Sequence, residues 1–429
     1  MNREALARLR RLGVVKGVKN LTSAQSHPAS SRDSEKEEKA PHLQAPDGDP
    51  QPLPSLLPGL QLTETAEGEC YVLDKVYPLD YRHGSACLHE LLELATGPVA
   101  CFCQDERLGK AHFRDYLFLD TETTGLGGAG TLAFMVGAAF YEDDAFVVRQ
   151  YFLRDHGDEP AMLLMLDELL QERAGLVTFN GQSFDLPLLE SRFLLNRMPL
   201  SLREWPHLDL LPPSRRLWRR RFDSCALGAL EQNVLGLTRT HQDVPGWLIP
   251  SLYHHYLRTG DGRELSRVFY HNRMDMLSMV TLATRIVRQF DAPQAGDHPI
   301  DLLGLGKWQV DLGLKKEAEQ TLRLAATPDL PTDLYRQALL RLGYLLKRAG
   351  RREEAVEVWQ QVACISFDDV TAHVELAKQY EWHDVNLPLA QTWTERALAL
   401  VDGAGSAAVR AELEHRLQRL KRKQAGVDE

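Results

Sequence analysis

The chain has 429 residues, with 50 lysines and arginines against 60 aspartates and glutamates, and its formal net charge is −10. With 44% hydrophobic and 26% charged residues the composition is that of a soluble globular protein, and no apolar run approaches the roughly 20 residues of a membrane-spanning helix. No apolar block follows the basic start, so we expect a cytoplasmic protein of two or three domains. Because the whole chain is acidic, nucleic-acid binding can only be argued from local features.

The first 60 residues differ in composition from the rest. Residues 1–20 hold six basic side chains and one acidic side chain, residues 21–60 contain seven of the 22 prolines, and no aromatic residue precedes Tyr71. Such a segment cannot bury enough apolar surface to offset its ordering entropy. We therefore expect residues 1–60 to be a disordered basic tail and a Pro/Ser/Glu-rich linker. The basic start is either a solvated helix, which we favour, or an arm that binds nucleic acid.

In residues 61–293 the spacing of hydrophobic residues alternates between the pattern of strands and that of helices. Strands are expected at 70–73, 99–102, 116–120, 132–140, 145–153 and 176–180. Helices are expected at 86–94, 160–173, 184–196, 224–234 and 264–290. Three adjacent strands followed by strand–helix alternation predict an α/β domain with a mixed sheet.

Residues 299–424 read as helix pairs with an internal period. Gly306 precedes Ala318 by twelve residues, Gly343 precedes Ala355 by the same distance, and a looser copy begins at Ala377. These units resemble tetratricopeptide repeats, which are about 34 residues long. We expect an all-α domain whose repeated positions serve packing and whose surface could bind a protein partner.

The central motif is the segment Phe118 to Gly125, which reads FLDTETTG. Asp120 and Glu122 stand at i and i+2 near the end of an apolar strand, so both carboxylates project from one face. Two carboxylates on one face repel each other unless a cation lies between them, and divalent ions prefer oxygen ligands. A solvated strand end is the alternative reading of this motif alone.

Two further segments supply carboxylates. Asn180 ends the strand at 176–180, and Asp185 enters the helix that follows, where it is either a charge at the helix N-terminus or a ligand over the end of the sheet. On the long helix, His271 and Asp275 are four residues apart and share a face. Taken together, the three segments are more specific than any one of them.

The order Asp-x-Glu, Asp, Asp resembles the DEDD superfamily of 3′–5′ exonucleases, which have a ribonuclease-H-like fold. The stretches Leu119–Thr131 and His207–Leu211, with the appended helical repeats, resemble the bacterial YprB-like branch more closely. The resemblance covers residues 65–290 well and the repeats loosely. It implies that Asp120, Glu122, Asp185 and Asp275 bind two divalent ions, Mg²⁺ or Mn²⁺, which clamp the scissile phosphate.

The motif offers two candidates for the general base, Tyr270 and His271. In the superfamily it is a His five positions before the last Asp or a Tyr four before it, whereas this chain has Tyr270 at five and His271 at four. A residue four positions away shares a helix face with its partner, so His271 is favoured as the catalytic base, acting as a neutral imidazole.

Other residues have weaker claims to bind nucleic acid. The segment Ser214–Phe222 contains five arginines and one tryptophan, and it is either a phosphate-binding and base-stacking element or a solvated basic face. The glycines of Gly127–Gly130 are either a phosphate-binding loop or a plain turn. Asp209 either supports the metal ligands from behind or is structural, and we favour the structural role. The nucleic-acid-binding residues that we predict are Thr123, Asn180, Arg215, Arg216, Trp218 and Arg219.

These features together predict a metal-dependent 3′–5′ exonuclease on single-stranded ends of DNA or RNA. The main alternative is an adaptor with helical repeats whose nuclease fold binds nucleic acid without cleaving it. Endonucleolytic cleavage is a third possibility that uses the same metals. The sequence does not distinguish DNA from RNA, because no element that reads the 2′-OH is visible.

Overall fold

The computed structural model describes residues 49–125, 130–365, 369–401 and 407–426 of the chain. Within these residues the main sheet has seven strands in the order β1-β2-β7-β6-β5-β8-β9. The first five in that order pair antiparallel, and β8 and β9 extend the sheet in parallel from β5. The strands are β1 (Gln61–Thr65), β2 (Gly68–Pro78), β5 (Tyr116–Thr123), β6 (Ala133–Glu142), β7 (Ala145–Phe152), β8 (Gly175–Thr178) and β9 (His207–Asp209). This mixed sheet confirms the predicted α/β, ribonuclease-H-like class.

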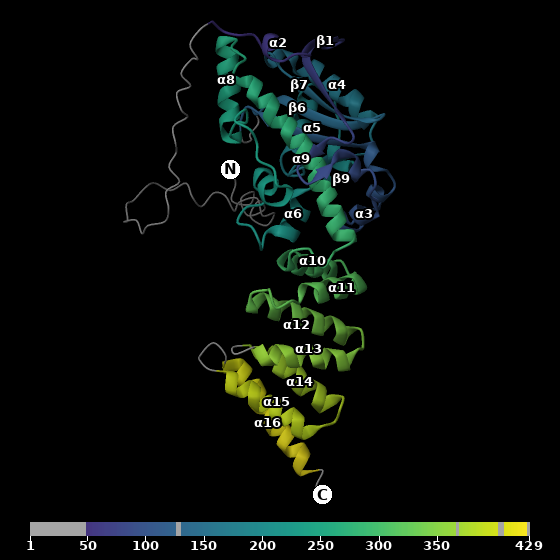
Figure 1. Cartoon of the computed structure of the whole chain (residues 1–429), viewed down its shortest axis with the longest axis vertical. Helices are drawn as coiled ribbons and strands as arrows, with labels where there is room; N and C mark the ends of the chain where they lie inside the picture. Colours follow the sequence, from purple (N-terminus) through teal and green to yellow (C-terminus); the bar gives the residue numbers. More distant parts are fainter. Residues whose placement is uncertain (1–48, 126–129, 366–368, 402–406, 427–429) are drawn as a thin grey trace, which may run out of the picture. The chain divides into compact units, whose positions relative to one another are not determined.

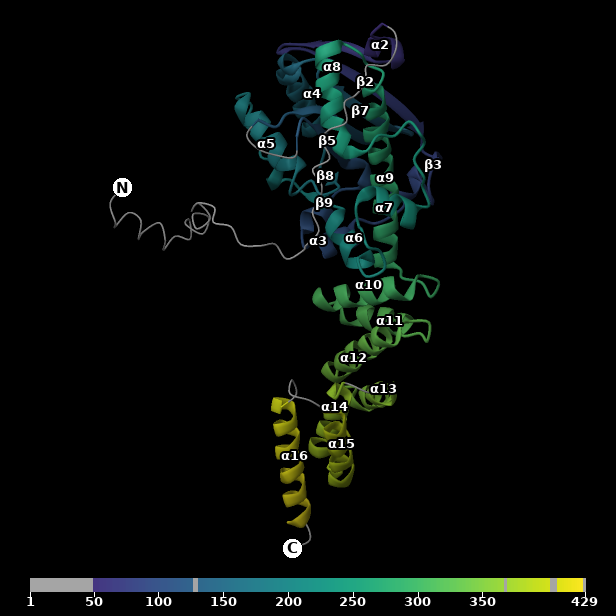
Figure 2. The ribbon, with the colours of Figure 1, turned by 90° about the vertical axis from the view of Figure 1, so that its left-hand side faces the viewer.

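Helices cover both faces of the sheet (Figures 1 and 2). Side chains alternate along β5, so Tyr116 and Phe118 pack with α9 (Leu265–Asp291), whereas Leu117 and Leu119 pack with α4 (Glu159–Gln171) and α5 (Asp185–Leu195). Further helices of this region are α2 (Leu53–Leu56), α3 (Gly97–Cys103), α6 (Leu211–Trp218), α7 (Leu227–Leu230) and α8 (Ile249–Thr259).

Three of the predicted elements are wrong. Residues 99–102, expected as a strand, lie in helix α3. The helix expected at 86–94 is a short strand, β4 (Ala86–Cys87), paired with β3 (Arg82–His83) and followed by a 3₁₀ turn (Leu88–Leu91). The helix expected at 224–234 is reduced to α7 and a π-helical turn (Glu231–Leu235). Short apolar runs are compatible with both the helical and the strand periodicity, so tertiary packing determines which structure they form.

The predicted linker is folded at its end. Leu53 is buried, and the Gln51 carbonyl accepts a hydrogen bond from the Gly262 backbone N–H at 2.7 Å. Residues 49–60 are therefore ordered, contrary to the prediction for 1–60. The prediction for residues 1–48 lies outside the described part of the chain.

The C-terminal part is all-helical, as predicted, and neighbouring helices pack in chain order (Figure 1). Gly306 and Gly343 lie where helices of a pair approach closely, because a Cβ at either would meet Leu322 at 2.8 Å or Trp359 at 2.4 Å. The helices are α10 (Pro299–Asp311), α11 (Lys315–Ala325), α12 (Thr332–Arg348), α13 (Arg352–Ile365), α14 (Thr371–Trp382), α15 (Leu387–Leu400) and α16 (Ala407–Ala425).

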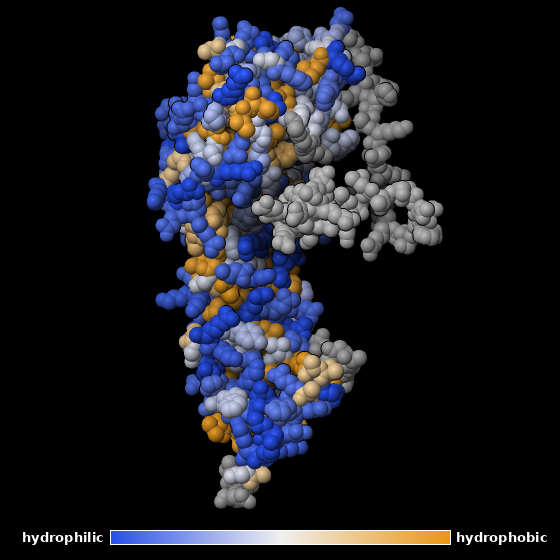
Figure 3. All heavy atoms as spheres, turned by 180° about the vertical axis from the view of Figure 1, so that it is seen from behind, coloured by the Kyte–Doolittle hydropathy of each residue, from blue (hydrophilic) through white to orange (hydrophobic). Residues whose placement is uncertain are grey.

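Helix α10 also belongs to the core of the preceding domain. Trp308 is buried, and its ring centroid lies 5.1 Å from that of Phe102 and 5.0 Å from that of Phe290. Seen from behind, the molecule shows hydrophobic residues in small patches among hydrophilic ones (Figure 3). Within the described residues, no helix is both long and apolar enough to span a membrane.

Candidate active site

The candidate site lies where β5 ends, on the face of the sheet that α9 covers. Asp120 and Glu122 follow Phe118 at every second position of β5, so they share its α9 face. Asn272 on α9 donates a hydrogen bond from Nδ2 to Asp120 Oδ2 at 3.0 Å. The strand and the long helix thus bring together residues 152 positions apart in the chain.

A glycine in β6 makes this contact possible. Gly137 pairs with Asp120 in the sheet, and a Cβ on Gly137 would lie 2.3 Å from Asn272 Oδ1. Gln150 on β7 donates from Nε2 to Asn272 Oδ1 at 3.0 Å and to the Phe269 carbonyl at 2.9 Å. Gln150 therefore fixes the amide of Asn272 with its NH₂ group toward Asp120.

Asp185 reaches the same region from α5. Its Oδ1 accepts hydrogen bonds from the Thr121 backbone N–H at 3.1 Å and from the Thr121 hydroxyl at 2.5 Å. Thr121 lies between Asp120 and Glu122, so Asp185 is tied directly to the segment that carries the first two carboxylates. Asp185 is 3% exposed and is not a solvated charge at a helix end.

Asp209 holds the loop between β8 and α5. Its carboxylate accepts the backbone N–H groups of Asn180 at 2.7 Å, Gln182 at 3.2 Å and Leu211 at 3.0 Å. Asn180 has a φ of 69°, in the left-handed region that asparagine tolerates better than most residues. The structural role expected for Asp209 is confirmed: it fixes the loop through which the chain reaches Asp185.

The fourth carboxylate, Asp275, lies beside His271. His271 Nε2 is 3.4 Å from Asp275 Oδ2, and His271 Nδ1 is 2.8 Å from Asp243 Oδ1. The ligating atoms of Glu122, His271 and Asp275 lie within 4.8 Å of one another. Tyr270 is directed elsewhere, since its hydroxyl accepts the Thr240 backbone N–H at 3.4 Å.

An arginine that the sequence did not reveal joins this cluster. Arg239 donates from Nη2 to Asp275 Oδ1 and, at 2.6 Å, to Glu231 Oε1, while its Nε donates to Glu231 Oε2 at 2.7 Å. Glu231 is buried and also accepts the Ser278 hydroxyl at 2.6 Å. Arg239 is thus a fixed cation, because the bidentate pair with a buried carboxylate leaves it little freedom.

The carboxylates raise one another's pKa values. Burial, reinforced by the charges of Asp275, Asp185 and Glu122, raises the pKa of Asp120 well above its ordinary value. Burial also raises the pKa of Glu122 to about 8 and that of Asp185 to about 6. Three of these acidic groups are buried and Asp120 is half-buried, and such clustered oxygen donors suit divalent cations.

The prediction of a neutral His271 does not hold for the protein without metal. Burial opposes protonation of the ring, but the hydrogen bond to Asp243 and the charges of Asp275 and Glu122 outweigh it and raise the pKa of His271 to about 9. Without metal, His271 is therefore a second counter-ion of the cluster at neutral pH, and its pKa would fall when cations bind nearby.

A cleft of about 850 Å³ opens over the cluster. Asp120, Asp275 and Asn180 line it together with Arg215 and Arg219 of the α6 segment. Both arginines are exposed and have no ion-pair partner among the residues that the structure describes. The cleft therefore combines carboxylates with two free guanidinium groups, which suits a phosphate-bearing ligand.

Among the other predicted nucleic-acid-binding residues, Trp218 requires correction, whereas Arg216 and Thr123 stay predictions. Trp218 is 1% exposed and packs in the core, so it cannot stack on a base. Arg216 pairs with Asp311 of α10 at 3.6 Å and does not line this cleft. Thr123 is buried, and its hydroxyl donates to the Gly125 carbonyl at 2.7 Å. Because the segment is helical, its side chains point in three directions. Arg215 and Arg219 face the cleft, Trp218 faces the core, and Arg216 faces α10.

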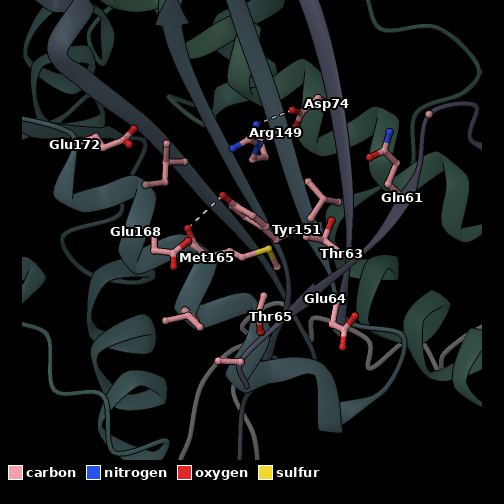
Figure 4. A pocket seen from close by; sticks show the side chains of 15 residues that line it. Gln61, Thr63, Glu64, Thr65, Asp74, Arg149, Tyr151, Met165, Glu168 and Glu172 are labelled. Atoms are coloured by element: carbon pink, nitrogen blue, oxygen red, sulfur yellow. Dashed lines mark hydrogen bonds and ion pairs between the residues drawn. The ribbon is translucent and has the colours of Figure 1, made fainter. Parts of the chain in front are cut away.

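The prediction for the glycine-rich loop concerns Gly127 and Gly128, which lie outside the described residues. The cavity of Figure 4 lies between α4 and the strands β1, β2 and β7. Arg149 and Asp74, which form an ion pair, are among the residues that line it. Its walls contain none of the predicted site residues.

Comparison with known proteins gives two findings. A family model described as RNase_H superfamily matches residues 117–287, a span that includes all four carboxylates, Arg239 and His271. The protein YprB of Bacillus subtilis (strain 168) is 34% identical over 367 residues, which cover 82% of this chain and 86% of YprB.

Proposed function

Because the chain belongs to the RNase H superfamily, and within it to the family of YprB, we propose that it is a metal-dependent 3′–5′ exonuclease. Its substrate would be a single-stranded end of DNA or RNA. The observation that carries this proposal is the proximity of four carboxylates from three distant segments, since the charges of Asp275, Asp185 and Glu122 raise the pKa of Asp120. Asp120 and Asp275 line the cleft, and Glu122 and Asp275 offer ligating atoms within 4.8 Å of each other. A module that only bound nucleic acid would have no use for four clustered acidic side chains beside its phosphate ligand.

Asp120, Glu122, Asp185 and Asp275 would hold two divalent ions, Mg²⁺ or Mn²⁺. Bound there, such ions would activate a water molecule and stabilise the departing oxygen of the phosphodiester. The chain supplies the rigid frame for these ligands. Asn272 orients Asp120, Thr121 orients Asp185, and Arg239 orients Asp275. Asp120, Asp185 and Asp275 are therefore held in place before any ligand arrives.

His271 is the proposed general base. Asp243 Oδ1 lies 2.8 Å from its Nδ1, and Arg239 Nη1 lies 3.1 Å from the same nitrogen. A proton on Nδ1, donated to Asp243, would leave Nε2 toward Asp275. Nε2 would take the proton of the attacking water. Arg215 and Arg219 would hold phosphates of the strand along the cleft, and Asn180 would line its path.

The test is an end-labelled oligonucleotide assay with matched DNA and RNA strands in Mg²⁺ or Mn²⁺. Unaltered protein should give a ladder of products shortened from the 3′ end, whereas the Asp120→Ala variant should give none. Asp144→Ala, which removes an exposed carboxylate in the turn after β6, is the matched control and should trim normally. A circular single strand should remain intact.

Two results would contradict the proposal. Binding of the strand without trimming in either metal would favour the adaptor. Internal cleavage of the circular strand would indicate an endonuclease instead.

A further inference from the structure

A second basic pocket lies in the C-terminal helices. Side chains from α12, α13, α14 and α16 enclose a cavity of about 250 Å³. Its walls include Lys347, Arg352, Lys378, Arg416 and the ring of Trp382. We call this cavity the Trp382 pocket. Nothing in the candidate active site uses it.

Cations outnumber carboxylates on one side of this pocket. Glu375 pairs with Lys347 and, at 3.0 Å, with Lys378. Arg352 lines the same cavity and has no ion-pair partner among the described residues. One carboxylate here faces three cations, so at least one positive charge is left for a ligand.

The same imbalance recurs on the other side. The side chain of Glu381 is fully buried and pairs with Arg416 at 2.7 Å, Arg419 at 2.8 Å and Lys423 at 2.9 Å. Across both groups, six cations share two carboxylates. Of the second group, Arg416 lines the pocket, and Arg419 and Lys423 contact the ring of Trp382. Cations therefore outnumber carboxylates in and beside the pocket, in a chain whose formal net charge is −10.

Trp382 adds an exposed aromatic ring to these charges. It is 56% exposed, and Lys423 Nζ and Arg419 Cζ lie 4.0 Å and 5.4 Å from its ring centroid. An exposed ring is not in itself a binding site, but this one lines a cavity beside several cations. A flat ring among cations is the combination with which proteins bind single strands, by stacking bases and neutralising phosphates.

We propose that the Trp382 pocket is a second binding site for single-stranded nucleic acid, in which Trp382 stacks on a base and Arg352 and Lys378 bind phosphates. This inference rests on the proposed function, since the bound strand would be the one whose 3′ end is trimmed at Asp120. An acidic protein segment would satisfy the cations but would leave the exposed ring without a stacking partner, so the nucleic acid is the better fit.

The test measures binding of fluorescein-labelled oligo(dT) and oligo(U) to the full chain by anisotropy, in EDTA so that the strand is not trimmed. The Trp382→Ala variant and the double variant Arg352→Ala/Lys378→Ala should each bind about 5- to 20-fold more weakly than the unaltered chain. In the double variant, the slope of log affinity against log salt should fall by about 1.4, at about 0.7 for each phosphate that is no longer neutralised.

Matched variants separate binding from folding. Trp382→Phe keeps a ring and should retain most of the affinity. Lys315→Ala/Lys316→Ala removes two exposed charges from α11, outside the pocket, and should bind as the unaltered chain does. Circular dichroism melts of all variants should coincide.

Three outcomes would overturn the inference, and they are distinguishable. If the unaltered chain neither binds nor, with metal, trims any strand, the exonuclease proposal fails as well. If it binds and trims but the pocket variants match it in affinity and salt slope, only the second site fails. If poly-glutamate binding depends on the pocket and oligonucleotide binding does not, the pocket serves an acidic protein partner.

Discussion

The protonation of individual residues in the candidate site makes the stability of the metal-free protein depend on pH. Glu122 and Asp185 have pKa values of about 8 and 6 in the folded protein without metal, above the values of roughly 4 in an unfolded chain. The folded state therefore binds more protons than the unfolded state between these values, so stability falls as pH rises through this window. His271 acts in the same direction, because its pKa of about 9 makes its stabilisation complete below about pH 6.5 and lost above pH 9.

We therefore expect the metal-free protein to melt at a lower temperature at pH 8.5 than at pH 6. The Glu122→Gln variant, which lacks the charge, should show a weaker pH dependence. Differential scanning calorimetry in EDTA measures both. A melting temperature that rises with pH, or an identical pH dependence in Glu122→Gln, would contradict this balance of charges.

A second prediction at the scale of single residues concerns Arg239. It supplies the fixed positive charge that Asp275 and buried Glu231 share, so Arg239→Met would leave two carboxylates without their partner. Loss of one member of a buried ion pair costs about 3–5 kcal/mol. Arg239→Met should lower the stability of the metal-free protein by roughly this amount, and Mn²⁺ should then raise its melting temperature more than that of the unaltered protein.

Urea denaturation measures the loss of stability, and thermal melts with and without Mn²⁺ measure the metal effect. Arg239→Lys should lose less stability because it keeps the charge. Equal midpoints for Arg239→Met and the unaltered protein would show that the arginine is not needed to balance the cluster.

At the scale of elements, sequence predicted the long, strongly patterned segments and failed on short ones. The strands β5, β6 and β7 and the helices α4, α5 and α9 were expected within a few residues of their bounds. Val99–Phe102 was misassigned because four apolar residues fit either period, and Pro98 at the start of α3 decides for a helix.

The same limit applies to the site. Asp120, Glu122, Asp185, His271 and Asp275 could be selected because each has a recognisable local pattern. Arg239 lies in a segment without regular structure and meets Asp275 only through folding, so no spacing reveals it. Gly137 is one residue in an apolar strand, and its purpose is visible only from the close approach of Asn272. The prediction that Trp218 stacks on a base was wrong, because a tryptophan on the buried face of a basic helix has the same sequence pattern as one that stacks on bases.

A prediction at the scale of elements concerns helix α10. Trp308 is 2% exposed and packs on Phe102 and Phe290 of the nuclease-like domain, although it was assigned to the repeats. Removing so large a buried side chain costs about 3–5 kcal/mol. Trp308→Ala should therefore destabilise the nuclease-like domain, and Trp382→Ala, at an exposed position, should change stability by no more than about 0.5 kcal/mol. Urea unfolding of the two variants compares them; equal midpoints would show that α10 is not part of this core.

Across the whole molecule, α6 joins the cleft to the helical repeats. Arg215 and Arg219 line the cleft, whereas residues beside them contact the C-terminal helices: Arg220 donates to Gln337 at 3.1 Å and Arg221 to Asp301 at 2.7 Å. A segment that looks uniformly basic in sequence thus serves two surfaces. The C-terminal helices support the helix that carries the proposed phosphate-binding arginines.

The central claim is that carboxylates from β5, α5 and α9 together bind divalent cations. Isothermal titration of the full chain with Mn²⁺ tests it most directly, with the Asp185→Asn variant beside it. We predict two ions bound per chain, with binding weakened at least tenfold in Asp185→Asn. Absence of Mn²⁺ binding, or the same affinity and stoichiometry in the variant, would contradict the account.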